Sequence, residues 1–283
     1  MKKQLLIAAV AASMATASMA DVSITGSAKA NVNNGNASIE SDLKITGKSG
    51  DSTLVANLSL DNGTGVTKQI VEDLYVTSSF QGVNMKVGQY RSGKSELDQT
   101  GATTSRYNLS TSVGPVSIAY EALEDNHDLT LGGEMAGVSV KHKMKKNDDT
   151  ETWVSGSFAG VNVAWNQEHT DSGDKDNTAI TVSTEMNGVT ATYVSIDAEV
   201  ATKSDGYVGK FELAAGEDAS AFGLSTSVAG NTVQFKAIEI ADVDSTKVIL
   251  TRPLASGATF EATYNDSDTD SKDSLDLELA VKF

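Results

Sequence analysis

Cysteine is absent from the sequence, proline is nearly absent with 2 residues in 283, and basic residues number only 22 against 38 acidic ones. Without cysteine, disulfide scaffolds, thiolate zinc sites and cysteine nucleophiles are excluded. The net charge of −16 argues against nucleic acid as a partner, because binding phosphate requires a basic surface. The hydrophobic fraction of 39% is low for a soluble domain, but the apolar residues follow a regular pattern.

The first twenty residues are predicted to be a secretory signal peptide. Lys2 and Lys3 form a basic start, Leu5–Ala12 is apolar, and small residues precede Asp21. The apolar stretch is shorter than the ~20 residues of a membrane-spanning helix, and no later apolar run reaches that length. We therefore expect an exported chain with a single domain over residues 21–283.

Beyond the signal peptide, apolar residues recur with a period of two. In Val22–Val32, positions 22, 24, 26, 28, 30 and 32 carry Val, Ile, Gly or Ala, while polar side chains occupy the positions between them. The same alternation recurs in Val161–Trp165 and along most of the chain, whereas no helix-length stripe with a period of 3.6 is found. Successive side chains of a strand point to opposite faces, so the pattern predicts strands with one apolar and one polar face.

Two kinds of turn separate these strands. Tight turns containing glycine alternate along much of the chain with longer polar connections such as Arg91–Ala102 and Thr170–Asp176. This arrangement is typical of an all-β, antiparallel transmembrane β-barrel with short periplasmic turns and longer external loops. An antiparallel sandwich alternates in the same way, but the outward positions here are small and the aromatic residues cluster towards strand ends, which favours the barrel.

About nineteen alternating runs can be counted, whereas a barrel with both termini at the tight-turn end needs an even number of strands. At least one run therefore does not span the membrane. The up-and-down pattern fails at Asp197–Ser220, where Tyr207–Ala215 is interpreted as part of a loop. The raw count favours eighteen strands, and the interior of so large a barrel would be open to water.

The polar face contains candidate pore-lining charges. In Val138–Lys145, the register that turns the valines towards lipid places Lys141, Lys143 and Lys145 in a basic row on the wet face. The opposite register would cost ~2–4 kcal/mol for each lysine at the membrane midplane. The alternative is the solvated face of a soluble sheet. Other charges expected to face the lumen include Asp42, Lys44 and Arg106.

Three stretches together resemble bacterial outer-membrane general porins. Glu72–Gly88 is similar to the hairpin before the third loop of that family, and Thr251–Tyr264 to its last turn. The chain then ends with apolar residues at alternate positions up to a terminal phenylalanine, which resembles the assembly signal read by the barrel-insertion machinery: Leu275, Leu277, Leu279, Val281 and Phe283.

The resemblance implies a homotrimer of barrels with about sixteen strands in the outer membrane of a Gram-negative bacterium, in contact with its lipid. It implies passive diffusion of small hydrophilic solutes, and a third loop that folds inward to narrow the pore. By position that loop contains Arg91, Lys94, Glu96 and Asp98. The loop is shorter than is usual in the family, and Gly88–Gln89 stands where the family has Gly-Arg, so a wider or differently gated pore is the alternative.

The surplus of acidic residues lies mainly in the loops and predicts a weak preference for cations, since charge at a pore mouth concentrates counter-ions. Asp266, Asp268 and Asp270 could hold a divalent ion, but they lack the pattern of a calcium loop and a solvated loop is favoured, so no metal site is predicted. The three histidines adjoin no nucleophile motif, so we expect no enzyme and no cofactor. A non-conducting structural or adhesive surface protein is the alternative function.

Overall fold

The computed structural model describes residues 21–33, 36–61, 68–91, 96–97, 103–123, 126–171, 173–268 and 273–283. The predicted signal peptide, Lys94, Asp98 and Asp270 lie outside these residues. Twenty strands are present in the described part of the chain, of which eighteen form one antiparallel sheet. Within these ranges, no helix is long and apolar enough to cross a membrane.

The strands of the first half follow one another around the sheet, each pairing with its predecessor. They are β1 (Asp21–Asn33), β2 (Asn36–Ser49), β3 (Ser52–Asp61), β4 (Lys68–Phe80), β5 (Val83–Tyr90), β6 (Thr104–Val113), β7 (Val116–Leu123), β8 (Asn126–Met135), β9 (Val138–Lys145) and β10 (Thr150–Phe158).

The second half continues in the same way except for one interruption, at which β13 pairs with β16 and the two strands between them form a separate hairpin. These strands are β11 (Val161–Thr170), β12 (Lys175–Met186), β13 (Val189–Ala198), β14 (Thr202–Asp205), β15 (Lys210–Leu213), β16 (Glu217–Val228), β17 (Asn231–Ile240), β18 (Val243–Pro253), β19 (Ala258–Ser267) and β20 (Ser274–Lys282).

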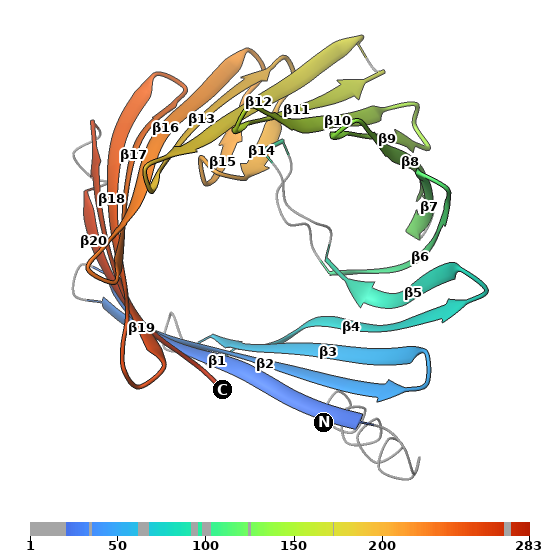
Figure 1. Ribbon diagram of the computed structural model, residues 1–283, viewed down its shortest axis with the longest axis horizontal. Coiled ribbons are helices and arrows are strands. Elements are labelled where there is room, and N and C mark those ends of the chain that lie inside the picture. The colour runs from blue at the N-terminus through green and yellow to red at the C-terminus, as the bar shows by residue number, and fades with distance from the viewer. Residues whose placement is uncertain are drawn as a thin grey trace.

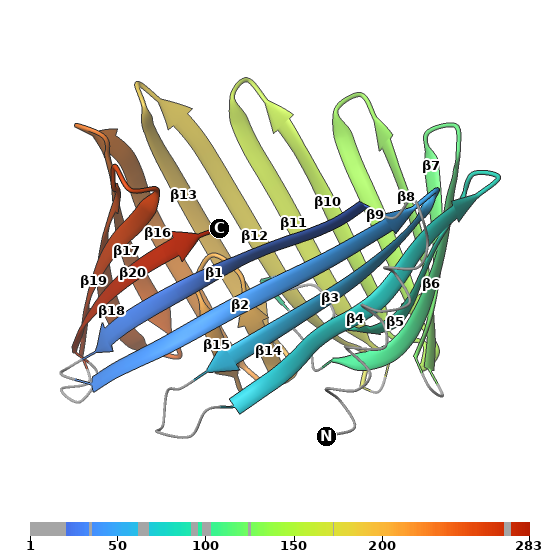
Figure 2. The ribbon, with the colours of Figure 1, turned by 90° about the horizontal axis from the view of Figure 1, so that it is seen from below.

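The sheet closes on itself because the last strand pairs with the first. β20 runs antiparallel to β1, and beyond its end the N–H groups of Gly26 and Phe283 each donate to the other residue's carbonyl oxygen, at 2.8 and 3.0 Å. Figure 1 looks down the resulting barrel, and Figure 2 shows its strands inclined across the wall. A closed barrel leaves no unpaired sheet edge. The predicted all-β antiparallel barrel is therefore confirmed.

The barrel has eighteen strands, as the raw count of alternating runs favoured, and the sixteen implied by the resemblance to general porins is wrong. The surplus runs are explained by the hairpin of β14 and β15, which belongs to the connection between β13 and β16 and lies inside the barrel (Figure 1). The segment Tyr207–Ala215, expected in a loop, contains the second strand of this hairpin.

The outer face of the wall carries the apolar half of the alternation. Ile24 is 60% exposed and Phe283 is 65% exposed. The C-terminal residues Leu275, Leu279 and Val281 are also exposed, while Leu277, on the same face, is half-buried. Exposed apolar side chains around a closed barrel suit a hydrocarbon surrounding, in which lipid adapts to whatever side chains it meets.

Tight turns join strands at the end of the barrel where both β1 begins and β20 ends. Asn187 and Gly188 have φ values of 52° and 76°, and Ala136 and Gly137 have 52° and 79°. Two positive φ values in succession are the geometry of a two-residue hairpin turn that follows the twist of the strands. At the opposite end, not every connection is long, because Ala241 and Asp242 alone join β17 to β18.

The seam between β1 and β20 makes a first testable prediction. A Cβ atom at Gly26 would lie 2.6 Å from the Phe283 ring and 2.7 Å from the Asp42 carbonyl oxygen. Gly26→Val should therefore destabilise the folded barrel by about 2 kcal/mol, the usual cost of overpacking. The loss would appear as a lower temperature for the heat-induced mobility shift on detergent gels. Ala30→Val, on the exposed face of the same strand, is the matched control and should leave that temperature unchanged.

Candidate pore constriction inside the barrel

The inner wall carries a network of ion pairs across β8 to β11. The Nζ atom of Lys143 lies 2.9 Å from Asp128 and 4.0 Å from Glu151, and that of Lys145 lies 2.5 Å from Glu151 and 3.0 Å from Glu168. The strand register places these five residues on one face, opposite the outward-facing His142 and Met144. Two lysines of the predicted basic row thus face three carboxylates, which compensate their charge.

Lys141, the third lysine of the row, is held differently. Its Nζ lies 4.2 Å from the centre of the Trp153 ring, and it forms no ion pair with a described residue. Lys86 on β5 is similar, with its Nζ 4.1 Å from the Tyr75 ring and 3.8 Å from the Tyr90 ring. Such cation–π contacts leave the positive charge of both amines in place. Both lysines line a cavity of about 680 Å³ inside the barrel.

Arg106 lies on the inner face of β6 and is only 9% exposed. Its guanidinium donates to Glu121 at 3.1 Å and to the Thr104 hydroxyl at 2.7 Å, and it lies 5.0 Å from the Tyr90 ring. The Tyr90 hydroxyl also donates to Glu121, at 3.1 Å. Tyr90 is one of the aromatic residues at strand ends, but it is 5% exposed and faces the lumen, so it does not belong to a membrane girdle.

Three further predicted site residues lie at two other places on the wall. Arg91, directly after β5, forms an ion pair of 2.6 Å with Glu72, and its N–H donates to Asp73 at 3.0 Å. Asp42 and Lys44 lie on the inner face of β2 and line a separate cavity of about 660 Å³ near the C-terminal end of the chain. The structure therefore does not bring Asp42 and Lys44 together with the lysines of β9.

The hairpin of β14 and β15 covers an apolar patch on the inner wall. Val208 and Leu213 of the hairpin segment are almost fully buried in one hydrophobic cluster. The wall contributes inward-facing apolar residues from β12, β13, β16 and β17: Ala179, Val194, Ile196, Ala198, Ala219, Ala221 and Ile238. The usual rule that a barrel's inward face is polar fails here, because the hairpin and not water contacts these side chains.

Two residues of the connection between β5 and β6 reach this hairpin. The carboxylate of Glu96 accepts a hydrogen bond from the Tyr207 N–H at 2.6 Å, and the Leu97 carbonyl accepts one from the Thr202 hydroxyl at 3.1 Å. Leu97 is 4% exposed within the cluster. β5 and β13 lie on opposite sides of the barrel (Figure 1). Glu96 and Leu97 therefore lie across the lumen from β5, the strand that precedes them in the chain.

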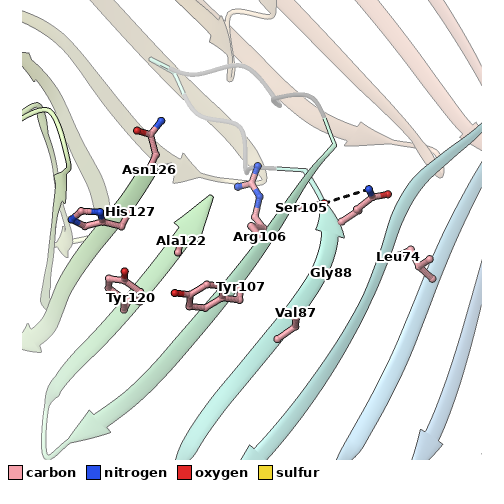
Figure 3. A pocket seen from close by; sticks show the side chains of 11 residues that line it. Leu74, Val87, Gly88, Ser105, Arg106, Tyr107, Tyr120, Ala122, Asn126 and His127 are labelled. Atoms are coloured by element: carbon pink, nitrogen blue, oxygen red, sulfur yellow. Dashed lines mark hydrogen bonds between the residues drawn. The ribbon is translucent and has the colours of Figure 1, made fainter. Parts of the chain in front are cut away.

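A groove of about 700 Å³ lies on the other side of the wall, over β4 to β8 (Figure 3). Its outward-facing aromatic residues contact one another, with ring centres 6.1 Å apart for Tyr107 and Tyr120 and 6.2 Å apart for Tyr120 and His127. Gln89 donates a hydrogen bond to Ser105 at 3.4 Å beside them. Amphipathic rings in this position are typical of a membrane-interface girdle, and the groove lies on the outer face of the wall, outside the lumen.

The described residues contain no group of three or more histidines or acidic side chains placed to hold a metal ion. Asp266 and Asp268 lie at and just beyond the end of β19, where the Asp268 N–H donates to the Asp244 carbonyl oxygen at 3.1 Å.

Comparison with solved structures identifies barrels of the same fold. OccD3 (OpdP) of Pseudomonas aeruginosa superposes with a TM-score of 0.69 at 10% identity, covering 94% of this chain and 91% of OccD3. A BenF-like porin of Pseudomonas fluorescens Pf-5 gives 0.66 at 10% identity, with 94% and 98% covered. OccK2 (OpdF) of Pseudomonas aeruginosa, solved in complex with glucuronate, gives 0.64 at 12% identity, with 93% and 96% covered. No protein-family model and no curated protein sequence matches the chain.

Sequence reasoning missed Tyr207, which lies in the turn of the lumenal hairpin, and the role of Trp153 beneath Lys141. One signal for the hairpin was available. Val194 and Ile196 lie on the same face of β13 as the polar residues near its tight turn, which is the face expected to line the lumen. They come immediately before the segment where the up-and-down pattern fails. Apolar residues on the wet face indicate that another part of the chain covers them.

The Glu96 carboxyl makes the contact with the hairpin depend on pH. Burial raises the pKa of Glu96 above its usual 4.5, although the N–H groups of Tyr207 and Val208 and the charge of Lys236 oppose the rise. The Glu96 carboxyl therefore binds a proton more tightly when it is docked on the hairpin than when it is free in water. The docked state is then most stable at low pH and becomes less stable as pH rises through the raised pKa. Amide hydrogen exchange at Tyr207 and Val208, corrected for intrinsic rates, should show protection falling in that direction.

Glu96→Gln keeps an oxygen that can accept from the Tyr207 N–H but cannot ionise. The protection of both amides should then be independent of pH between 4 and 8. A pH dependence that persists unchanged in Glu96→Gln would assign it to another group.

Proposed function

We propose that this chain is an outer-membrane channel through which small hydrophilic solutes and ions diffuse. The observation that carries the proposal is the pairing of two surfaces on one closed wall, an apolar surface outside and a charged surface with cavities inside. The porin fold of the compared structures supports it. The solute crosses without covalent chemistry, and its passage depends on the bore and on the charges that it meets.

We further propose a weak preference for cations. Lys143 and Lys145 are compensated by three carboxylates, so they contribute little net positive field to the lumen. The net charge of −16 then acts mainly through acidic loop residues at one end of the barrel. Charge of one sign near a pore mouth raises the local concentration of the opposite ion within about 8 Å at physiological salt.

The homotrimer, the contact with outer-membrane lipid and the recognition of the C-terminal strand by the insertion machinery belong to the same proposal. The outward placement of Leu279, Val281 and Phe283 supports the contact with lipid. A non-conducting surface barrel is the competing function, and conductance measurements separate the two.

A sugar acid is a second candidate solute. OccK2 was solved with glucuronate, and in this chain Lys86 and Lys141 present charges without an ion-pair partner among the described residues to one cavity. A carboxylate entering that cavity would meet two amines held by aromatic rings. We propose that small carboxylates can use this route even though the overall preference is for cations.

The channel itself is tested in a planar lipid bilayer. The refolded protein should give discrete conductance steps, and a tenfold KCl gradient should give a reversal potential of the sign that indicates excess K⁺ flux. The potential should shrink as the salt concentration rises at a fixed gradient, because screening weakens the charge at the mouth. Clear anion selectivity would contradict the proposed preference, and an absence of steps would favour the non-conducting alternative.

The route for carboxylates is tested by Lys141→Gln. Removing one lumenal charge that has no ion-pair partner among the described residues should lower the permeability of glucuronate relative to K⁺ by about threefold, the scale of one charge interaction in a wet site. Lys175→Gln, at the exposed start of β12, is the control with the same loss of charge. Equal effects of the two variants would show that total charge, and not Lys141, controls the ratio.

A further inference from the structure

The hairpin of β14 and β15 is attached to the wall at its turn by one aromatic residue. Tyr207 packs against Gly223 of β16, where any Cβ atom would collide with the Tyr207 hydroxyl. Gly223 faces the lumen, because its register partner Thr192 lies between the inward-facing Val194 and Thr190 on β13. The absence of a side chain at position 223 therefore creates a notch in the inner wall that the phenol of Tyr207 fills.

Polar contacts hold Tyr207 in this notch. Its hydroxyl lies near Thr192 on β13 and Gln234 on β17. Lys236 of β17 donates to the Tyr207 carbonyl oxygen at 2.8 Å, and its Nζ lies 3.9 Å from the centre of the Tyr207 ring. Three adjacent wall strands thus surround one residue of the hairpin, and Lys236 contacts both its carbonyl and its ring.

Tyr207 also contacts the connection between β5 and β6. The Tyr207 N–H donates to Glu96, whose carboxylate also lies so close to Gly206 that a Cβ atom there would collide with it. Leu97 completes the contact through the Thr202 hydroxyl and the hydrophobic cluster. The chain of contacts runs from the wall to Tyr207 and from Tyr207 to Glu96.

We propose that Tyr207 is the positioning residue of the constriction: seated in the Gly223 notch and held by Lys236, it fixes the hairpin on the inner wall and thereby sets where Glu96 and Leu97 lie in the lumen. The bore of the channel is then set by a contact inside the barrel and not by the barrel wall, whose strand pairing does not involve the hairpin. This inference rests on the proposed channel function for its conductance readout.

The experiment compares two variants that empty or fill the notch. Tyr207→Ala removes the phenol, and Gly223→Val places a side chain where the hydroxyl lies. Both should raise single-channel conductance about twofold and admit larger neutral polyethylene glycols than the parent protein admits. Tyr193→Ala, which removes an outward-facing phenol from the same wall, is the matched control and should change neither. Tyr207→Phe keeps the ring over Lys236 and should give an intermediate result.

Limited trypsin digestion provides a readout that does not require conduction. Lys203 and Lys210 are exposed on either side of the hairpin turn. Release of the turn should accelerate cleavage after these lysines at least severalfold in Tyr207→Ala and Gly223→Val, while the heat-modifiable gel shift shows that the barrel remains folded.

The outcomes separate the two proposals. If the parent protein does not conduct but the two notch variants are cleaved faster, the seating is supported and the channel function is wrong. Tyr207 does not position the constriction if the two notch variants conduct and exclude polymers as the parent protein does. The same conclusion follows if Tyr193→Ala changes conductance and polymer exclusion as much as the notch variants do.

Discussion

The rest of the structure depends on backbone hydrogen bonding along every edge of the closed sheet. A strand in hydrocarbon must find partners for its N–H and C=O groups along both edges, since each unpaired group costs several kcal/mol. Eighteen strands meet this requirement only when β20 returns to β1, which the mutual bonds of Gly26 and Phe283 complete at the seam. Closure gives the sheet an inner and an outer face. The alternation of side chains then makes the outer face apolar and the inner face largely polar.

The lumen of this barrel contains charged side chains of the wall and a hairpin of the chain itself. The charges on the wall are largely compensated by one another, as in the pairing of Lys145 with Glu151 and Glu168. The apolar patch around Val194 and Ile196 is covered by the lumenal hairpin, and Leu97 joins the same cluster from across the barrel. The cluster under the hairpin is therefore a small hydrophobic core inside the barrel, stabilised by burial in the same way as the core of a soluble protein.

The wall of the barrel could be predicted from the sequence more fully than the side-chain contacts in its lumen. The register that places Lys141, Lys143 and Lys145 on the inner face follows from the outward preference of Val138 and Val140, and the structure has that register. The carboxylates beside those lysines come from three other strands, and no local pattern in the sequence specifies which strands adjoin. Tyr90 illustrates the same limit, because an aromatic residue at a strand end suits a girdle equally well until Arg106 and Glu121 are found beside it.

The sequence by itself determined the elements, their alternation and the identity of the outward face, because a period of two and glycine turns act over a few neighbouring residues. Tertiary structure decided the number of strands in the wall and the fate of the segment between β13 and β16. Whether that segment pairs into the sheet or folds into the lumen depends on contacts with residues far away in the chain. Gly223, Lys236 and Glu96 contact Tyr207 in the lumen, and they come together only in the closed barrel.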